Sequence, residues 1–468
     1  MSAFSFLDRE HTVAGPGFTR WLVPPAALAV HLAIGQAYAF SVFNKPLSQM
    51  IGITKSLDGV DWKISDLGWI FSTAIVVLGL SAAIFGKWVE RSGPRKTMLV
   101  AACCFGAGFM IAGFGASIHS LLVIIFGYGV VGGIGLGLGY ISPVSTLIKW
   151  FPDRPGMATG MAIMGFGGGA LIGSPLATNL MAKFATPQST GVVPTFYAMG
   201  AIYFVFMLMG PLVVRVPPPD WKPEGFVPPV KSEKLVTTGQ VVADEAIKTP
   251  QFWLLWLVLF LNVTAGIGVL GQASLMLQEI FSGRLTTGIT DQKAALAAVT
   301  AAGAGFTALL SLFNIAGRFF WSSLSDFLGR KNVYMIYFAL GALTYALIPT
   351  LGKSGNIILF VLTFGVILSM YGGGFATIPA YLRDLFGTIQ VGAIHGRLLT
   401  AWSAAGIAGP SLVNYIREYQ INHGVAKADS YNFTMYVMAG LLVIGFICNF
   451  LVSPVEQKHY QKSEGKMA

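Results

Sequence analysis

The chain has 468 residues, of which 54% are hydrophobic and only 11% are charged, and its net charge at pH 7 is +10. Soluble proteins carry about 25% charged residues. The mean hydropathy of +0.68 therefore excludes an ordinary soluble domain and requires lipid as the solvent for most of the chain. No pattern of basic and stacking aromatic residues points to nucleic acid, so anionic lipid and membrane topology account for the positive charge.

Uncharged runs follow one another along the chain. A helix that spans a bilayer needs ~20 apolar residues, and these runs are too long and too uninterrupted for barrel strands. The 97–148 run holds two spans around a turn at 117–120, so we expect about twelve helices in an all-α integral membrane fold. The runs are 21–44, 67–86, 97–148, 155–182, 184–214, 249–278, 294–317, 332–352, 354–382, 398–416 and 430–455.

The N-terminal segment does not have the pattern of a cleaved signal peptide. Acidic and basic residues mix within positions 1–20, and no small-residue cleavage site follows the first apolar run. We therefore expect the first span to be retained. Cys103, Cys104 and Cys448 all lie in apolar runs without metal-ligand spacing, so we expect no metal, no disulfide framework and no cofactor.

Loop charges predict the orientation. With an even number of spans both termini share a side, and the loops of that side hold about twice as many Lys and Arg residues as the opposite loops. This bias predicts a multi-pass protein of the plasma (inner) membrane with both termini in the cytoplasm.

A proline-rich polar stretch at 215–248 is the longest segment between spans. Prolines favour an extended linker, and a short helix is expected near Val241–Ile247. The stretch divides the chain into an N-terminal six-helix half (1–214), a cytoplasmic linker (215–248) and a C-terminal six-helix half (249–468).

One short loop pattern occurs twice, 236 residues apart. The first copy is Gly86 followed by Glu90-Arg91-Ser92-Gly93-Pro94-Arg95-Lys96, and the second is Ser322 followed by Asp326-Phe327-Leu328-Gly329-Arg330-Lys331. Gly156 and Gly160 match Gly392 and Gly396 at the same offset. A duplicated membrane protein of this kind indicates a transporter with its site between two halves.

The residue types of this loop have physical roles. Gly93 and Gly329 can adopt φ > 0 at a helix end, and Glu90 or Asp326 can meet a helix N-terminus or a basic residue. The alternative is a charged turn that only fixes topology. The pattern resembles the signature loop of the major facilitator superfamily, with Glu90 for the usual Asp and Ser322 for the usual Gly. That resemblance implies a major facilitator fold of two six-helix pseudo-repeats, in which this loop latches the halves in the outward-open state.

The latch and gate candidates therefore include this loop and the charged residues of neighbouring cytoplasmic loops. The loop pairs Asp153-Arg154 and Arg383-Asp384 are expected to serve as partners of the repeated motifs, with solvated loop charge as the alternative. The candidates are Gly86, Glu90, Arg91, Gly93, Arg95, Asp153, Arg154, Asp326, Gly329, Arg330, Asp384 and Arg397.

Four longer stretches narrow the resemblance. They are similar to the oxalate/formate antiporter branch, which is related to the monocarboxylate transporters and moves small carboxylates such as oxalate, formate, lactate and pyruvate. The stretches are KWFPDRPGMATG (149–160), TPQFWLLW (249–256), GRFFWSSLSDFLGRK (317–331) and HGRLLTAWSAAGIAGP (395–410).

Arg318 stands out independently of any family. It lies eight residues before Asp326, ~12 Å along a helix, and an arginine at that depth should face a polar interior with a partner. No Asp or Glu lies deep in any span, which suggests that an anionic substrate supplies the counter-ion through a bidentate contact. The alternative is an arginine that snorkels to the interface, although the matching repeat position, Ala82, lies well inside a span.

The resemblance assigns roles near Arg318. An arginine at this position binds the substrate carboxylate in the family, and Asn314 lies on the same helix face. Proton-coupled monocarboxylate transporters have an aspartate where this chain has Asn314, which puts that proton route in doubt. Oxalate antiporters have a lysine where this chain has Trp402, so we expect a monocarboxylate, with simple packing of Trp402 as the alternative.

Further polar groups in the spans are candidates to orient a small ligand. They are Gln36, Tyr38, Tyr140 and Tyr371, and each has packing as its alternative. His31 can carry a proton near neutral pH or be satisfied by a neighbouring helix.

The sequence therefore predicts a secondary active transporter of small monocarboxylates (lactate, pyruvate or formate type) that works by alternating access, either as a proton symporter or as an anion exchanger. The alternatives are an oxalate:formate (dicarboxylate) antiporter and a transporter-like carboxylate sensor. No catalytic constellation indicates an enzyme. Expected partners are a small carboxylate anion, membrane lipid and, under symport, protons; we expect no nucleic acid and a monomer.

Overall fold

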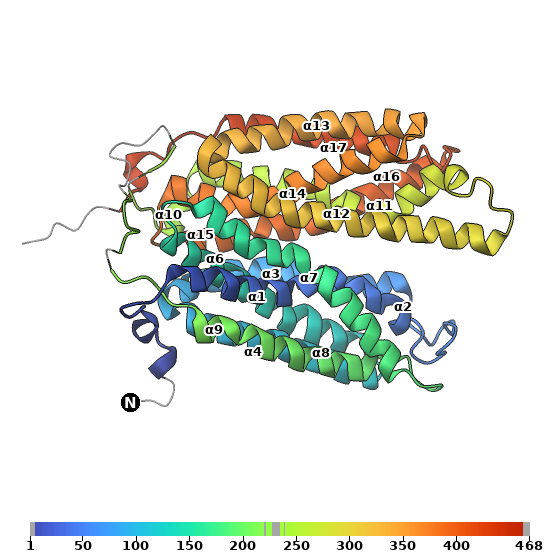
Figure 1. Cartoon of the computed structure of the whole chain (residues 1–468), viewed down its shortest axis with the longest axis horizontal. Coiled ribbons are helices and arrows are strands. Elements are labelled where there is room, and N and C mark those ends of the chain that lie inside the picture. The colour runs from blue at the N-terminus through green and yellow to red at the C-terminus, as the bar shows by residue number, and fades with distance from the viewer. Residues whose placement is uncertain (1–4, 220, 227–234, 238, 462–468) are drawn as a thin grey trace, which may run out of the picture. The chain divides into compact units, whose positions relative to one another are not determined.

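The computed structural model describes residues 5–219, 221–226, 235–237 and 239–461, and Figure 1 shows their helices. Within these residues the only β-type pairs are isolated bridges at Val13–Val216 and Thr186–Ser189. The elements are η1 (Ser5–Leu7), η2 (Arg9–Thr12), η3 (Arg20–Leu22), α1 (Val23–Ile34), η4 (Gly35–Phe43), α2 (Asn44–Leu47), α3 (Ile64–Ser92), α4 (Pro94–Ser117), α5 (Leu121–Ile124), η5 (Ile125–Gly132), α6 (Gly133–Trp150), α7 (Pro155–Phe184), α8 (Val192–Met207), α9 (Met209–Val213), α10 (Ala243–Ala246), α11 (Pro250–Leu285), α12 (Gln292–Leu328), α13 (Arg330–Ser354), α14 (Ile357–Phe386), α15 (Val391–Leu398), α16 (Thr400–Asn422), α17 (Asn432–Phe450) and η6 (Gln457–His459).

The expected multi-span helical fold is confirmed. Among the described residues, 11 helices are long and apolar enough to cross a membrane. The helix α16 is also long, with 23 residues, but it is not apolar enough to be among these 11. The short helix expected near Val241–Ile247 is α10.

The described residues group into two compact units. Unit 1 comprises Met1–Trp253, Pro379–Ser403 and Ser453–Ala468, and unit 2 comprises Leu254–Ile378 and Ala404–Val452. The predicted division into 1–214, 215–248 and 249–468 follows the repeat in the sequence, whereas these units group residues by their contacts. The division therefore stays a prediction.

In unit 1, glycines let helix backbones touch. A Cβ on Gly35 would lie 2.3 Å from the carbonyl oxygen of Phe166, and one on Gly169 would lie 2.3 Å from the carbonyl carbon of Gly35. The first span therefore packs directly against α7, and it continues past Gly35 as the tighter 3₁₀ segment η4. Small residues at helix contacts are typical of membrane proteins.

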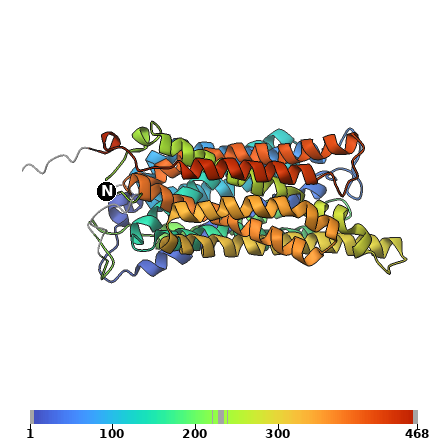
Figure 2. The same ribbon diagram turned by 90° about the horizontal axis from the view of Figure 1, so that it is seen from above.

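Unit 2 is built from long helices. Figures 1 and 2 show α11 and α12, yellow-green to gold, as a hairpin. These helices have 36 and 37 residues. The helix α13 packs beside α17. Lys331, the second residue of α13, donates to the carbonyls of Phe450 and Val452 at the end of α17, which satisfies carbonyl groups that a helix end leaves open.

Candidate functional site

Arg318 is buried in α12, with an exposed fraction of 0%. Its Nε donates to Asn314 Oδ1 at 3.1 Å, one helical turn earlier. The central guanidinium carbon lies 5.3 Å from the centre of the Phe375 ring on α14, and such a ring face attracts a cation. The structure thus brings Arg318 and Asn314 together, and the burial argues against a side chain that snorkels to a surface.

Glycine residues on α14 make this arrangement possible. A Cβ on Gly372 would lie 2.4 Å from Asn314 Oδ1 and 3.1 Å from Arg318 Cγ. Only a glycine at this position lets α14 approach the polar side chains of α12 so closely. Tyr371, which directly precedes Gly372, is buried and packs edge-on against Phe375, with 5.3 Å between the ring centres.

Acidic side chains on the long helices of unit 2 have other cations as partners. Glu279 accepts hydrogen bonds from Arg417 and, at 2.6 Å, from the Tyr431 hydroxyl. Asp326 pairs with Arg330 at 2.6 Å. Each of these two carboxylates therefore has an arginine as a partner.

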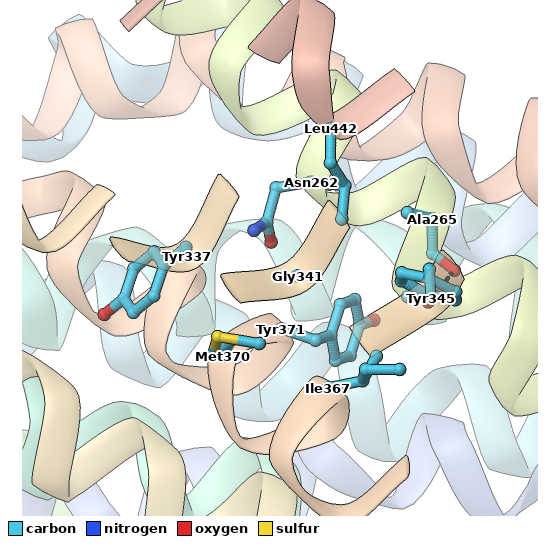
Figure 3. A pocket seen from close by; sticks show the side chains of 10 residues that line it. Asn262, Ala265, Tyr337, Gly341, Tyr345, Ile367, Met370, Tyr371 and Leu442 are labelled. Carbon is cyan, nitrogen blue, oxygen red and sulfur yellow. Dashed lines mark hydrogen bonds between the residues drawn. The ribbon is translucent and has the colours of Figure 1, made fainter. Parts of the chain in front are cut away.

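A small cavity of unit 2 lies beside Tyr371, and Figure 3 shows the side chains that line it. Its volume of about 10 Å³ has room for about one water molecule, so in this conformation it is too small for a carboxylate. Within the described residues Asn262 Oδ1 is buried there without a hydrogen-bond partner.

An aromatic cluster in unit 1 contains three of the predicted residues. Trp402 is fully buried, and its ring centre lies 5.4 Å from Tyr140, 5.1 Å from Phe166 and 6.4 Å from Tyr38. Tyr38 also packs edge-on against Phe166 at 5.1 Å. The structure thus brings Tyr38, Tyr140 and Trp402 together, although they are far apart in sequence.

His31 belongs to the edge of this cluster, whereas Gln36 does not. The His31 ring packs against Tyr140 at 5.2 Å, and its Nδ1 lies 3.0 Å from the Ala27 carbonyl oxygen. Gln36 Oε1 accepts from the Tyr128 hydroxyl at 2.9 Å. Gln36 is therefore held in packing between helices of unit 1.

The first copy of the repeated loop makes the contact that its acid suggested. Glu90 Oε1 accepts from the backbone N–H of Gly392, at the start of α15, at 2.8 Å and from Ser145 Oγ at 2.7 Å. Its Oε2 accepts from Lys149. A helix N-terminus and an ammonium group both favour a carboxylate. Gly86 lets α3 approach α15, because a Cβ there would lie 2.7 Å from Ala393 Cα.

The glycines of both copies have the expected backbone. Gly93 has φ of +81° between α3 and α4, and Gly329 has φ of +82° between α12 and α13. In the second copy Arg330 joins Asp326 and Ser325 within one loop. In the first copy Arg95 donates to the Phe6 carbonyl, while Arg91 is exposed.

The predicted acids of the other cytoplasmic loops pair with arginines. Asp153 binds Arg20 through two hydrogen bonds of 2.7 and 3.0 Å. Burial opposes ionisation of Asp153, but the hydrogen bonds from Arg20 hold its pKa below the ordinary value. Asp384 accepts from Arg383 at 3.0 Å, and Arg154 is exposed. The partner of Asp153 is therefore the N-terminal segment.

The linker supplies a contact that the sequence did not indicate. Asp244 on α10 accepts from Lys87 of α3 and, at 2.6 Å, from Arg397 of α15. These hydrogen bonds from Lys87 and Arg397 lower the pKa of Asp244 to about 2. Gln240 Oε1 accepts from the backbone N–H groups of Thr388 and Ile389 at 2.8 and 3.1 Å. No pattern in the sequence predicts these contacts, because they join segments that are far apart along the chain.

A second residue that sequence reasoning missed is His395 on α15. It is 1% exposed, and its ring centre lies 5.8 Å from that of Tyr140. The signal was present in the sequence, because His395 opens one of the stretches that carries the family resemblance.

Many apolar helices, a signature loop that binds the start of another helix, and a buried arginine define a multi-span transporter of small solutes. The family model of the Major Facilitator Superfamily matches residues 26–311 and 287–467. The chain belongs to the Major Facilitator Superfamily, whose members are membrane transporters and not enzymes.

Two curated relatives handle small carboxylates by name. The chain is 26% identical to the oxalate:formate antiporter of Oxalobacter formigenes, over 83% of this chain and 82% of that protein. It is 22% identical to apicoplast pyruvate carrier 1 of Toxoplasma gondii, over 85% and 77%. Among solved structures, the fucose:proton symporter FucP of E. coli has a TM-score of 0.62 at 12% identity, covering 93% of this chain and 100% of that one.

Proposed function

We propose that this transporter carries small monocarboxylates of the lactate, pyruvate or formate type, and that Arg318 binds the carboxylate. The observation that carries the proposal is the buried guanidinium, with its Nε held by Asn314 Oδ1 and its face against Phe375. A carboxylate binds an arginine through two parallel hydrogen bonds, and this geometry fixes the plane in which they form.

The choice of a monocarboxylate is supported by the aromatic cluster of unit 1. A second carboxylate would need a second cation, and the position where oxalate antiporters have a lysine holds Trp402, buried among Tyr38, Tyr140 and Phe166. Rings of this kind fit the apolar part of a small organic acid. The similarity to the oxalate:formate antiporter makes dicarboxylate exchange the second candidate function.

The proposal includes alternating access in the plasma (inner) membrane, with both termini and the 215–248 linker in the cytoplasm. The bias of basic residues supports this orientation. Proton symport and anion exchange are the two coupling modes.

Uptake of labelled lactate, pyruvate, formate and oxalate into proteoliposomes tests the proposal, with and without a proton gradient. We expect saturable uptake of a monocarboxylate by the wild type and at least a tenfold loss in Arg318→Lys, because an ammonium keeps the charge but cannot make the bidentate contact. Arg284→Lys, at an exposed position outside the candidate site and latch, is the matched control. If Arg318→Lys transported normally, or if oxalate alone were carried, the monocarboxylate assignment would be wrong.

A variant that fails to fold would obscure this result, so ligand-induced thermal stabilisation is measured alongside uptake. A bound substrate raises the stability of the folded state. We expect lactate or pyruvate to raise the Tm of the wild type and of Arg284→Lys but not that of Arg318→Lys.

A further inference from the structure

His395 is a buried imidazole on α15. Its exposed fraction is 1%, and within the described residues neither Nδ1 nor Nε2 has a hydrogen-bond partner. A neutral imidazole has one N–H donor and one acceptor nitrogen, so both are left unsatisfied. Buried polar groups in this condition are rare and call for an explanation.

The duplicated sequence shows that packing alone does not require a histidine here. The position 236 residues earlier is Thr159 on α7, which is also fully buried. The Thr159 hydroxyl lies 3.0 Å from the carbonyl oxygens of both Pro155 and Gly156 in its own helix. The first repeat thus fills the equivalent position with a small side chain that satisfies its own polar group.

His395 lies next to the contact that joins α15 to α3. Three residues earlier, Gly392 donates its N–H to Glu90 at 2.8 Å. One residue later, a Cβ on Gly396 would lie 2.2 Å from the Ala82 carbonyl oxygen. Backbones this close exclude water, so the imidazole is dry as long as α15 is packed on α3.

We propose that His395 is a proton-binding site whose protonation favours the arrangement in which α15 has separated from α3. An imidazolium is a charge, and a charge in a dry, apolar site is strongly disfavoured. Separation of the two helices would hydrate the ring, which then titrates near pH 6.5 as an exposed histidine does. Protons therefore shift the equilibrium toward the separated state by mass action.

Apart from His31, the titratable and charged groups around α15 do not provide an alternative home for this proton between pH 5.5 and 8. On α3, Glu90 and Lys87 are engaged with Lys149, Gly392 and Asp244. On α10, Asp244 is held by Lys87 and Arg397. From α6, Tyr140 packs against the His395 ring, and His31 on α1 packs against Tyr140. The variant His31→Gln separates the contribution of His31 from that of His395. Carboxylates of ordinary pKa stay ionised throughout this range.

Spin labels on both sides of the contact test the inference in the full-length protein. Cysteines replace Ile84 on α3 and Ile389 before α15, which are 71% and 48% exposed, in a background in which Cys103, Cys104 and Cys448 are alanine. The distance between the labels is measured in lipid nanodiscs from pH 8 to 5.5 without substrate. We expect the separated population to increase about tenfold relative to the packed one between pH 7.5 and 5.5, as linkage to one histidine requires.

The variants His395→Gln and His395→Thr, the second matching the first repeat, should both remove this pH dependence, while the control His31→Gln should keep it. Persistence of the pH response in both His395 variants, or no response in the wild type, would overturn the inference. The inference rests on the proposed function only in its use of alternating access. Because the distances are measured without any carboxylate, its failure and that of the Arg318 assignment are distinguishable.

Discussion

At the scale of single residues, the candidate site depends on one asparagine. Asn314 is a neutral acceptor that holds Arg318 Nε at 3.1 Å without cancelling its charge. An aspartate at the same place would form an ion pair with the guanidinium, and the substrate carboxylate would then compete with a resident anion. The amide therefore adds no negative charge of its own beside the guanidinium.

The variant Asn314→Asp tests this account. An aspartate beside an arginine has a lowered pKa, so it stays ionised at neutral pH and binds Arg318. We expect the KM for the monocarboxylate to rise at least tenfold at pH 7.5 and to stay raised down to pH 5, because an aspartate with a lowered pKa remains ionised over this whole range. The measurement is KM in proteoliposomes at several pH values, with the wild type and Asn314→Ala at the same pH as controls. A KM like that of wild type at pH 7.5 would show that Asn314 does not set the charge of the site.

At the scale of elements, α15 is where sequence reasoning was least complete. The acid and glycine of the repeated loop predicted that Glu90 would meet a helix N-terminus or a base, and it meets both. Two contacts between segments distant in sequence were not predicted. Asp244 pairs with Lys87 and Arg397, and Asp153 pairs with Arg20. Apolar runs and a repeat at a fixed offset can be recognised in the sequence. A contact between two distant segments depends on how the chain packs, so it leaves no pattern in the sequence.

The Asp244 contact predicts a role for the linker. Asp244→Asn would weaken the bonds that tie α10 to Lys87 and Arg397, and α10 should then exchange its amide protons faster. Because the side chain is half exposed, the loss of stability should be about 1 kcal/mol or less and should diminish at high salt. The measurement is hydrogen exchange of residues 239–248, with Glu245→Gln as the control, since Glu245 binds Lys248 and His459 instead.

The pH dependence of this contact follows from the same bonds. The pKa of Asp244 is lowered to about 2, below its ordinary value, so its contribution is complete above pH ~4 and is lost only as the pH falls toward 2. We therefore expect the difference between wild type and Asp244→Asn to be constant from pH 5.5 to 8. A difference that vanished at pH 6 would mean that another group controls the linker.

At the scale of the whole molecule, the distribution of charge limits what can be carried. In the described part of unit 2, the acids Glu279 and Asp326 are matched by Arg417 and Arg330. Arg318 adds one positive charge at the candidate site, which suits one carboxylate. The position of Arg318 inside a span could be predicted from the sequence, because uncharged runs delimit the spans. The aromatic rings around Trp402 could not, because Tyr38, Tyr140 and Trp402 are far apart in sequence and meet only in the folded chain.

This charge balance predicts the response to membrane potential. A monocarboxylate that moves with one proton, or exchanges for another monocarboxylate, transfers no net charge, whereas exchange of divalent oxalate for formate transfers one. One charge moved across 100 mV is worth ~2.3 kcal/mol, or about a 50-fold change in the equilibrium accumulation ratio. We therefore expect accumulation of lactate or pyruvate in proteoliposomes to be unchanged by a potassium diffusion potential of about 100 mV, with the pH held equal on both sides. A shift approaching that size would indicate that the transported acid carries a second charge and would favour the dicarboxylate antiporter, because neither monocarboxylate coupling mode responds to the potential.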